Sequence, residues 1–406
     1  MIRKESSHGI GYSVVELHNV RHIFAAAVPR TGMTLREQTQ DALGTIRRVI
    51  DEQQGARGSI VHQAVFIRDY SLKEECRRLI KDFYGSELPA TTYIAQPPCQ
   101  GKLISIEALG VGSRENEVEI ERRSEDLVIT RHSGVSWIHC AQVVPEMTGG
   151  GVYDRSVNAF VAMRRRLDSA GVPFDNVIRT WLYLGDIVGP EGETQRYKEL
   201  NRARTDYYED IPFCQDKLPG CIKGPVFPAS TGIGTNNGDV VMSCIAISTD
   251  RKDLKLIPLE NPFQTSACDY AAEYSPKSPK FARAMALSCG ECATIFVSGT
   301  ASITDSESRH LDDAAAQTHQ TLDNIEALIS ERNFEGHGTP GLGATLDDLA
   351  LVRVYIKRQE DYAQTRAACE ARFGEVPTIY AIADVCRPEL LVEIEAVAFS
   401  GHCCPR

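Results

Sequence analysis

Residues 38–46 read QTQDALGTI and residues 317–325 read QTHQTLDNI, so Gln, Thr, Leu and Ile fall at identical offsets in the two segments. In both, the apolar residues recur at helical spacing. This pattern predicts amphipathic helices over roughly 34–53 and 312–332. Because a repeated motif of this kind indicates a chain built from related units, we expect the two helices to be equivalent parts of a repeat.

The elements expected after each helix also match. In the first copy they are a strand at 62–69, a helix at 71–84, Pro89, and strands at 91–95 and 102–111. In the last copy they are a strand at 351–357, a helix at 360–373, Pro377, and strands at 378–385 and 390–399. The spacing from Ile67 to Pro89 is one residue longer than that from Ile356 to Pro377, so the order and the spacing are both maintained.

A looser middle copy completes the chain. Its expected elements are a strand at 136–144, a helix at 153–170, a strand at 178–185, a helix at 195–209 and a strand at 239–248. Helices with one apolar face suggest sheets covered on one side, whose other faces are free to pack together. The sequence thus predicts an α/β (α+β) protein of three tandem β–α–β–α–β units, at 1–115, 125–255 and 275–406.

Composition narrows the class of protein. The chain has 406 residues, of which 42% are hydrophobic and 24% charged, as in globular proteins. The formal charge of −11 disfavours a nucleic-acid partner, since phosphate backbones would be repelled. The N-terminal MIRKESSHGIGYS lacks the apolar run of a signal peptide, and no stretch of about eighteen apolar residues occurs. We therefore expect a cytoplasmic protein without a membrane partner.

The 13 cysteines are scattered and read as free thiols. Cys289 and Cys292 form one CxxC, and His402, Cys403 and Cys404 lie near the end of the chain. A single CxxC is a weak zinc signal, and a hairpin turn at Gly290 explains it as well. We expect neither a metal nor an organic cofactor.

The repeat pattern resembles the Rid (YjgF) superfamily, whose small domains pack their sheets together as trimers with ligand sites at the junctions. Three copies in one chain imply an intramolecular pseudo-trimer, complete as a monomer, although a higher oligomer is possible. Several segments are similar to the chorismatase branch in particular: RTWLY (179–183), QRYKELNRAR (195–204), the PASTGIG turn (228–234), VSGTASI (297–303) and CRPELLVEIEA (386–396). The resemblance covers nearly the whole chain.

In that family a functional carboxylate is the first Glu of an E-I-E strand. The equivalent triplets here are Ser105-Ile106-Glu107, Ser243-Cys244-Ile245 and Glu393-Ile394-Glu395. The i, i+2 spacing puts Glu393 and Glu395 on one face of a strand, although such a pair could also face solvent or bind arginines. Since only the last copy has both carboxylates, we expect one working site, with Glu393 as its catalytic acid.

Chorismate carries two carboxylates, so its pocket needs arginines and hydroxyl donors. Alternation places Arg179, Trp181 and Tyr183 on one face of their strand. The other substrate-binding candidates are Arg196 and Arg204 on the next helix, Thr300 and Ser302 in a turn after a strand, and Cys386 and Arg387 before the last strand. Each arginine could instead form a surface ion pair, and Cys386 could be a plain buried side chain.

The resemblance implies a chorismatase-like enzyme that cleaves the enolpyruvyl ether of chorismate, or of a related acid, by general-acid catalysis and releases pyruvate. The alternative is a catalytically silent Rid-type protein that binds small carboxylate metabolites and acts as a regulator. An imine deaminase is disfavoured because Thr91 and Ile379 stand where that family has a carboxylate-binding Arg. An endoribonuclease is disfavoured by the acidic charge and the absence of a basic stripe with interleaved aromatics.

Overall fold

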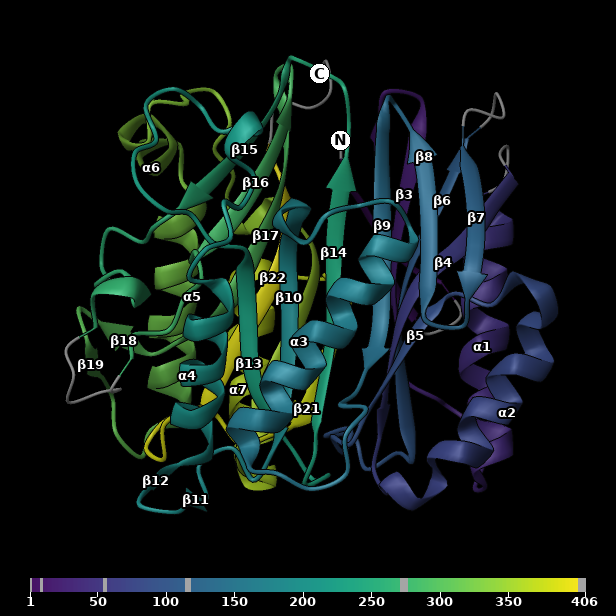
Figure 1. Cartoon of the computed structure of the whole chain (residues 1–406). Helices are drawn as coiled ribbons and strands as arrows, with labels where there is room; N and C mark the ends of the chain where they lie inside the picture. Colours follow the sequence, from purple (N-terminus) through teal and green to yellow (C-terminus); the bar gives the residue numbers. More distant parts are fainter. Residues whose placement is uncertain (1, 8–9, 54–56, 114–117, 271–276, 401–406) are drawn as a thin grey trace.

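The computed structural model describes residues 2–7, 10–53, 57–113, 118–270 and 277–400. Three six-stranded sheets form the framework, in the orders β1-β2-β3-β6-β4-β5, β7-β8-β9-β14-β10-β13 and β15-β16-β17-β22-β20-β21. The three orders are the same when strands are compared by their rank within each unit. Figure 1 shows α4 and α5 on one side of the molecule and α1 and α2 on the other, with the strands between them.

The first unit opens with a meander and continues through two helices. Its elements are β1 (Ile2–Ser7), β2 (Ile10–Leu17), β3 (Val20–Ala27), α1 (Leu35–Glu52), β4 (Arg57–Ile67), α2 (Lys73–Tyr84), β5 (Ala90–Ile94) and β6 (Ile104–Ser113). Helix α1 begins at a capping box, in which the Glu37 amide donates to the Thr34 hydroxyl and the Thr34 amide donates to the Glu37 carboxylate.

The second unit repeats this order. Its elements are β7 (Glu119–Ser124), β8 (Leu127–His132), β9 (Val135–Val143), α3 (Val152–Ser169), β10 (Val177–Gly185), the short β11 (Pro190–Glu191) and β12 (Thr194–Gln195), α4 (Arg196–Tyr208), β13 (Ala229–Thr235) and β14 (Val240–Ser248). All nine residues of β10 are buried, because the strand lies inside its sheet between α-helices and the neighbouring units.

The third unit has the same order with small additions. Its elements are β15 (Leu254–Leu259), β16 (Ala284–Cys289), β17 (Cys292–Ala301), the short β18 (Ile303–Thr304) and β19 (Glu307–Ser308), α5 (Ala314–Ile329), α6 (Glu331–Gly336), β20 (Leu349–Ile356), α7 (Tyr362–Phe373), β21 (Thr378–Ile382) and β22 (Val392–Phe399).

The equivalence predicted from the repeated helix motif is confirmed. Helix α1 joins β3 to β4 and α5 joins β17 to β20, which hold the same ranks in their sheets. In each unit the last strand inserts between the third and fourth and pairs antiparallel to both. The chain is thus an intramolecular pseudo-trimer of Rid-like units.

Two local expectations need correction. The segment 228–234, expected as a turn, lies mostly in β13, which pairs parallel to β10. Thr300, expected in a turn, lies inside β17, and only Ser302 follows that strand. The expected hairpin at Gly290 is confirmed, since β16 and β17 pair up to Cys289 and Cys292 and Gly290 has a φ of +64°. His402, Cys403 and Cys404 lie outside the described residues.

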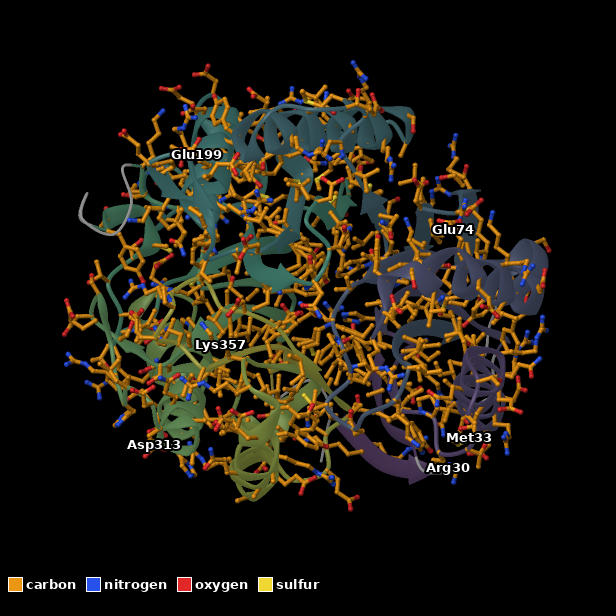
Figure 2. All side chains as sticks on the ribbon, turned by 90° about the horizontal axis from the view of Figure 1, so that it is seen from below. Arg30, Met33, Glu74, Glu199, Asp313 and Lys357 are labelled. Atoms are coloured by element: carbon orange, nitrogen blue, oxygen red, sulfur yellow. The ribbon has the colours of Figure 1, made fainter. Side chains whose placement is uncertain are left out.

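The helices lie at the periphery, and side chains fill the region where the sheets meet. Figure 2 places the labelled Glu74, Glu199 and Asp313, one from each unit, toward the outside. A small cavity of about 40 Å³ at the meeting point is lined from all three sheets, for example by Phe24 of β3 and Phe296 of β17. No helix in the described ranges is long and apolar enough to cross a bilayer.

Buried histidines in this inner region predict acid sensitivity. Burial lowers the pKa of His22 and of His139 to about 3 and that of His132 to about 4, and it also lowers the pKa of His62. The unfolded chain therefore binds protons near pH 6.5 that the folded chain does not take up until pH 3 to 4. Stability should fall as pH drops through this window, by about 1.4 kcal/mol per pH unit for each histidine.

Urea unfolding measured between pH 7 and pH 4.5 tests this expectation. His139→Gln should flatten the pH dependence, because it removes one of these proton sites. His319→Gln, which changes an exposed histidine on α5, should leave the slope unchanged. A wild-type stability that stays constant down to pH 4.5 would contradict the assignment.

Candidate active site

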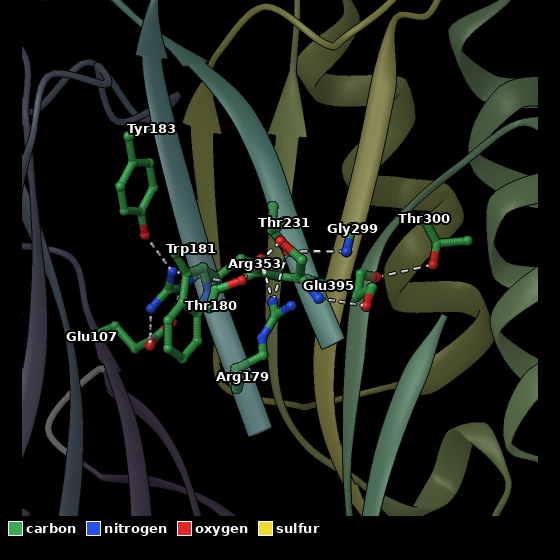
Figure 3. Close-up of polar contacts among 12 residues, drawn as sticks. Glu107, Arg179, Thr180, Trp181, Tyr183, Thr231, Gly299, Thr300, Arg353 and Glu395 are labelled. Carbon is green, nitrogen blue, oxygen red and sulfur yellow. Dashed lines mark hydrogen bonds and ion pairs between the residues drawn. The ribbon is translucent and has the colours of Figure 1, made fainter. Parts of the chain in front are cut away.

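A buried polar network joins the three units; we call it the hub. Arg353 of β20 binds both carboxylate oxygens of Glu107 of β6, each at 2.6 Å, and donates to the hydroxyl of Tyr183 of β10 at 2.9 Å. Its Nη1 also lies 3.1 Å from Oε1 of Glu395. Glu395 in turn accepts from Arg179 at 2.9 Å. Figure 3 shows that the hub contains residues from all three units.

The hub accounts for the residues predicted on one face of β10. Arg179 and Trp181 both donate to Glu395, at 2.9 and 2.8 Å, and the guanidinium of Arg179 lies over the Trp181 ring. Tyr183 bonds to Arg353. The two carboxylates of the hub, Glu107 and Glu395, are therefore neutralised by two arginines.

Beside the hub, a pocket of about 240 Å³ opens between the second and third units. From the second unit it is lined by Gln195, Tyr197, Lys198, Asn201 and Arg204 of β12 and α4 and by Ser230 and Gly232 of β13. The segment before β16 adds Tyr270, Pro279, Phe281 and Arg283. The third unit contributes Gly299, Ala301, Ile303, Cys386, Arg387, Pro388, Glu389 and Glu393.

Glu393 is the buried acid of this pocket. Its side chain is only 4% exposed and lies on the same face of β22 as Glu395, as the i, i+2 spacing predicts. Burial, followed by repulsion from Glu395, raises the pKa of Glu393 to about 8, although Arg179 and Arg283 act in the opposite direction. Glu393 therefore holds a proton at neutral pH, whereas Glu395 is paired with Arg179 and Arg353.

Two buried arginines supply positive charge to the same pocket. Arg204 of α4 is 1% exposed and donates to Ser230 and to the side chain of Asn201. Arg283 donates to the backbone oxygen of Thr265 and to the hydroxyl of Tyr270. The Nε atoms of both are buried without a partner in the described structure. Each arginine thus has one donor that no group of the described chain uses.

These two arginines lie against the same ring. The guanidinium groups of Arg204 and Arg283 are each 5.3 Å from the centre of the Phe281 ring. Phe281 therefore keeps the two cations at a defined separation and buries their apolar stems. Such a pair suits a ligand with two carboxylates.

Two glycines shape the wall around the acid. A Cβ on Gly299 of β17 would overlap Oε1 of Glu393, so only glycine lets the backbone approach the carboxyl so closely. A Cβ on Gly232 of β13 would lie 2.9 Å from Cε2 of Tyr197, which lines the pocket. In both strands, glycine leaves space that a larger residue would take from the pocket.

The equivalent junction between the first and second units also holds a pocket, of about 410 Å³, but its lining is different and includes Tyr93 and Gln142. Gln142 lies in the bulge of β9, as Gly299 lies in the bulge of β17, and its Oε1 accepts from the Tyr93 amide at 2.8 Å. Tyr93 holds the place of Gly232, since each follows a threonine on the edge strand. The strand registers place Val241 at the position of Glu393 and Ser243 at that of Glu395, so the triplet expected at 243–245 is two residues too late. The chemistry expected from Glu393 is therefore absent at this junction of the described chain.

The sequence-predicted residues divide into three groups. Glu393, Arg204, Cys386 and Arg387 line the pocket, whereas Arg179, Trp181 and Tyr183 form the hub. The remaining three have local partners outside the pocket lining: Arg196 binds Glu191 and the carbonyls of Gly185 and Gly238, Thr300 donates to the Ser298 carbonyl, and Ser302 donates to the Arg309 carbonyl.

Sequence reasoning missed Arg283, Tyr270 and Tyr197. Arg283 and Tyr270 come from the segment between β15 and β16, where no repeat pattern draws attention to them. Tyr197 follows the predicted Arg196 and precedes Asn201 and Arg204 by one helical turn and two, so helical spacing from Arg204 could have found it.

The fold and the pocket define a tandem Rid-type protein with a buried acid, Glu393, in a pocket between its second and third units. A family model described as "Chorismatase FkbO/Hyg5-like, N-terminal" matches residues 115–246, and one described as "Endoribonuclease L-PSP" matches residues 280–400. A 3-hydroxybenzoate synthase of Streptomyces hygroscopicus is 33% identical over 287 residues, covering 69% of this chain and 79% of that protein. The chain belongs to the chorismatase family.

Further relatives agree with this assignment. A chorismatase of Streptomyces rapamycinicus is 31% identical, covering 66% of this chain and 77% of that protein. A solved chorismatase structure matches with a TM-score of 0.66 at 20% identity, covering 95% of this chain and 99% of that one, and shows the shared fold. A RutC family protein of Pyrococcus abyssi is 31% identical over 109 residues, covering 26% of this chain and 77% of its own length.

Proposed function

We propose that the protein cleaves the enolpyruvyl ether of chorismate, or of a closely related enolpyruvyl acid, and releases pyruvate. The observation that carries this proposal is the buried Glu393 carboxyl, with its pKa raised to about 8, in one pocket with Arg204 and Arg283. An enol ether needs a proton donor that remains protonated at neutral pH. Membership of the chorismatase family supports the same reaction.

In this mechanism Glu393 donates its proton to the methylene carbon of the enolpyruvyl group. The carbon that bears the ether oxygen becomes an oxocarbenium-like centre, water adds to it, and the resulting hemiketal collapses to pyruvate and a dihydroxycyclohexadiene carboxylate. The atoms balance with one water consumed and no redox partner. The Glu393 carboxylate left by the first step lies within the field of Arg179 and Arg283, which favours its charged form.

Arg204 and Arg283 are our candidates for binding the substrate carboxylates. Both are buried, both line the pocket, and each has an unpartnered Nε. A guanidinium held rigidly on an aromatic ring loses little freedom when it binds an anion. The carboxylate-binding role predicted for Arg179 passes in this proposal to these two residues, because Arg179 serves Glu395.

Cys386 contributes a neutral thiol to the wall. Burial, followed by the nearby Glu393, raises the pKa of the Cys386 thiol to about 12, so it carries no charge at neutral pH and is a weak nucleophile. Gln195 donates to the Cys386 backbone carbonyl at 3.2 Å, which ties this loop to the second unit. We assign Cys386 a contact with substrate rather than a covalent step.

The test is pyruvate release from chorismate by the wild-type protein, followed with a coupled dehydrogenase assay. Chromatography of the products separates hydrolysis from rearrangement to a hydroxybenzoate, the product named for one relative. Chorismate binding measured by calorimetry without any pyruvate would favour the second candidate, a silent carboxylate-binding protein. The absence of both binding and turnover would exclude both candidate functions.

Gly299→Ala should abolish most of this activity. The added methyl group would overlap Oε1 of Glu393 and push the acid out of position. A displacement of about 1 Å in a catalytic group costs on the order of 10²-fold in rate. The matched control is Gly44→Ala on α1, where a Cβ meets nothing within 4 Å and should leave turnover at the wild-type level. Wild-type turnover in Gly299→Ala would show that the carboxyl does not need its present position.

A further inference from the structure

The hydroxyl of Thr231 on β13 holds two donors at once. Its Oγ1 accepts from Nη2 of Arg179 at 2.7 Å and from the Gly299 amide at 2.9 Å. Thr231 is fully buried, and Figure 3 shows it between the arginine and the glycine. This hydroxyl therefore connects the hub with the bulge of β17.

The same bulge forms the wall against the acid. The Gly299 backbone approaches Glu393 so closely that a Cβ there would overlap Oε1, and the Thr231 methyl carbon lies 3.1 Å from that Cβ position. An amide next to a carboxylate normally donates to it and stabilises the charged form. Here the Gly299 amide donates to Thr231 instead. The acid thus has an apolar methyl group nearby and a backbone donor that is occupied elsewhere.

We propose that Thr231 is a positioning residue that withholds the Gly299 amide from Glu393 and so keeps this acid protonated for the proposed reaction. The inference rests on the proposed function for its consequence in catalysis. The protonation of the Glu393 carboxyl can be measured without turnover.

The other charged and titratable groups near the acid come from several elements. They are Glu395 on β22, Arg179 on β10, Tyr270 and Arg283 before β16, Cys386, Arg387 and Glu389 between β21 and β22, and Tyr197, Lys198 and Arg204 on α4. Of these, Glu395 disfavours the ionised acid, whereas Arg179 and Arg283 favour it. None of them occupies the Gly299 amide, so the contact between this amide and Thr231 is a separate influence on the acid.

The protein contains a matched contact without the acid. At the junction of the first and second units, the Gln142 amide donates to the hydroxyl of Thr92 on β5 at 3.3 Å. Gln142 lies in the bulge of β9 as Gly299 lies in that of β17, and Thr92 is as buried as Thr231. A threonine hydroxyl that accepts from the amide of a bulge residue is therefore found at both junctions. Only at Thr231 does it face a carboxyl.

The experiment is infrared titration of the full-length protein. The absorption of the protonated Glu393 carboxyl is isolated as the difference between a protein and its Glu393→Gln counterpart. In Thr231→Val the Gly299 amide loses its acceptor and is free to donate to the carboxylate, so the midpoint of the titration should fall by about one pH unit, a tenfold change in the ratio of the two forms. Thr231→Ser keeps the acceptor and should restore the wild-type midpoint. Thr92→Val should leave it unchanged.

The outcomes separate three cases. A lower midpoint in Thr231→Val alone, with a matching shift in the pH at which turnover is lost, supports the proposal. Equal midpoints in wild type, Thr231→Val and Thr92→Val, with similar losses of thermal stability in both variants, would reduce Thr231 to a structural role and overturn it. If the valine variant does not fold, Thr231→Ala removes the same hydroxyl with less bulk. Failure of wild-type pyruvate release would remove the proposed function and leave this titration test intact.

Discussion

Glu393→Gln is expected to lower turnover of chorismate by a factor of ~10²–10⁴ while binding largely survives. Glutamine keeps the shape of the side chain and removes its acidic proton. Because Arg204 and Arg283 remain in the pocket, the loss of one neutral carboxyl changes the binding charges little. Calorimetry measures the affinity, and pyruvate release measures the rate.

The pH dependence supplies an independent check. Since the pKa of Glu393 is raised to about 8, the wild-type rate should remain high below that pH and fall as pH rises through it and the proton is lost. The Glu393→Gln variant should not show this fall in rate at high pH. Glu291→Gln, a change at an exposed position in the turn between β16 and β17, should retain both rate and profile. Equal rates for wild type and Glu393→Gln would remove Glu393 from the mechanism.

Arg353→Met is expected to produce the largest loss of stability. Its guanidinium binds both oxygens of Glu107 and lies 3.1 Å from Glu395, and all three side chains are almost fully buried. Removing one partner of a buried pair leaves an uncompensated charge, which costs about 3–5 kcal/mol in the free energy of unfolding. Urea unfolding followed by circular dichroism measures the change.

A double-mutant cycle assigns this loss to the charge. Glu107→Gln neutralises the orphaned carboxylate, so Arg353→Met combined with Glu107→Gln should be less destabilised than the two single changes added together. Arg372→Met breaks an exposed cluster with Asp323 and Glu326 and should change stability by no more than about 1 kcal/mol. A strictly additive double variant would mean that Arg353 acts through packing alone.

Much of the fold could be predicted because local patterns repeat. The helix motifs at 38–46 and 317–325 and the near-constant spacing to Pro89 and Pro377 place equivalent elements at equal ranks. Strand β13 was missed because its sequence, ASTGIGT, has the small and glycine-rich composition of a turn. Its glycines serve tertiary contacts: a Cβ on Gly234 would lie 2.7 Å from the Asp384 carbonyl oxygen. No local signal reports such an approach.

The part of the site that could be predicted is the part that a local sequence pattern identifies. The E-I-E pattern identifies Glu393, and the pocket around it includes Arg204, Cys386 and Arg387, which were also predicted. Alternation correctly grouped Arg179, Trp181 and Tyr183 on one face of β10, but it could not say what that face meets. Glu395, the partner of Arg179 and Trp181, is more than 200 residues away in the chain, and only the packing of units brings them together.

Covalent linkage of the three units has a further consequence. In a trimer of identical chains, every substitution occurs three times, so a change that improves one junction is imposed on the others, and dilution separates the subunits. Here the neighbouring unit is always present at a high effective concentration, so assembly does not depend on the amount of protein. Each junction is also free to diverge independently. Gln142 and Tyr93 line one junction, whereas Gly299 and Gly232 leave room beside the acid at another. Asymmetry between junctions, which an assembly of identical subunits cannot encode, is heritable in a single gene.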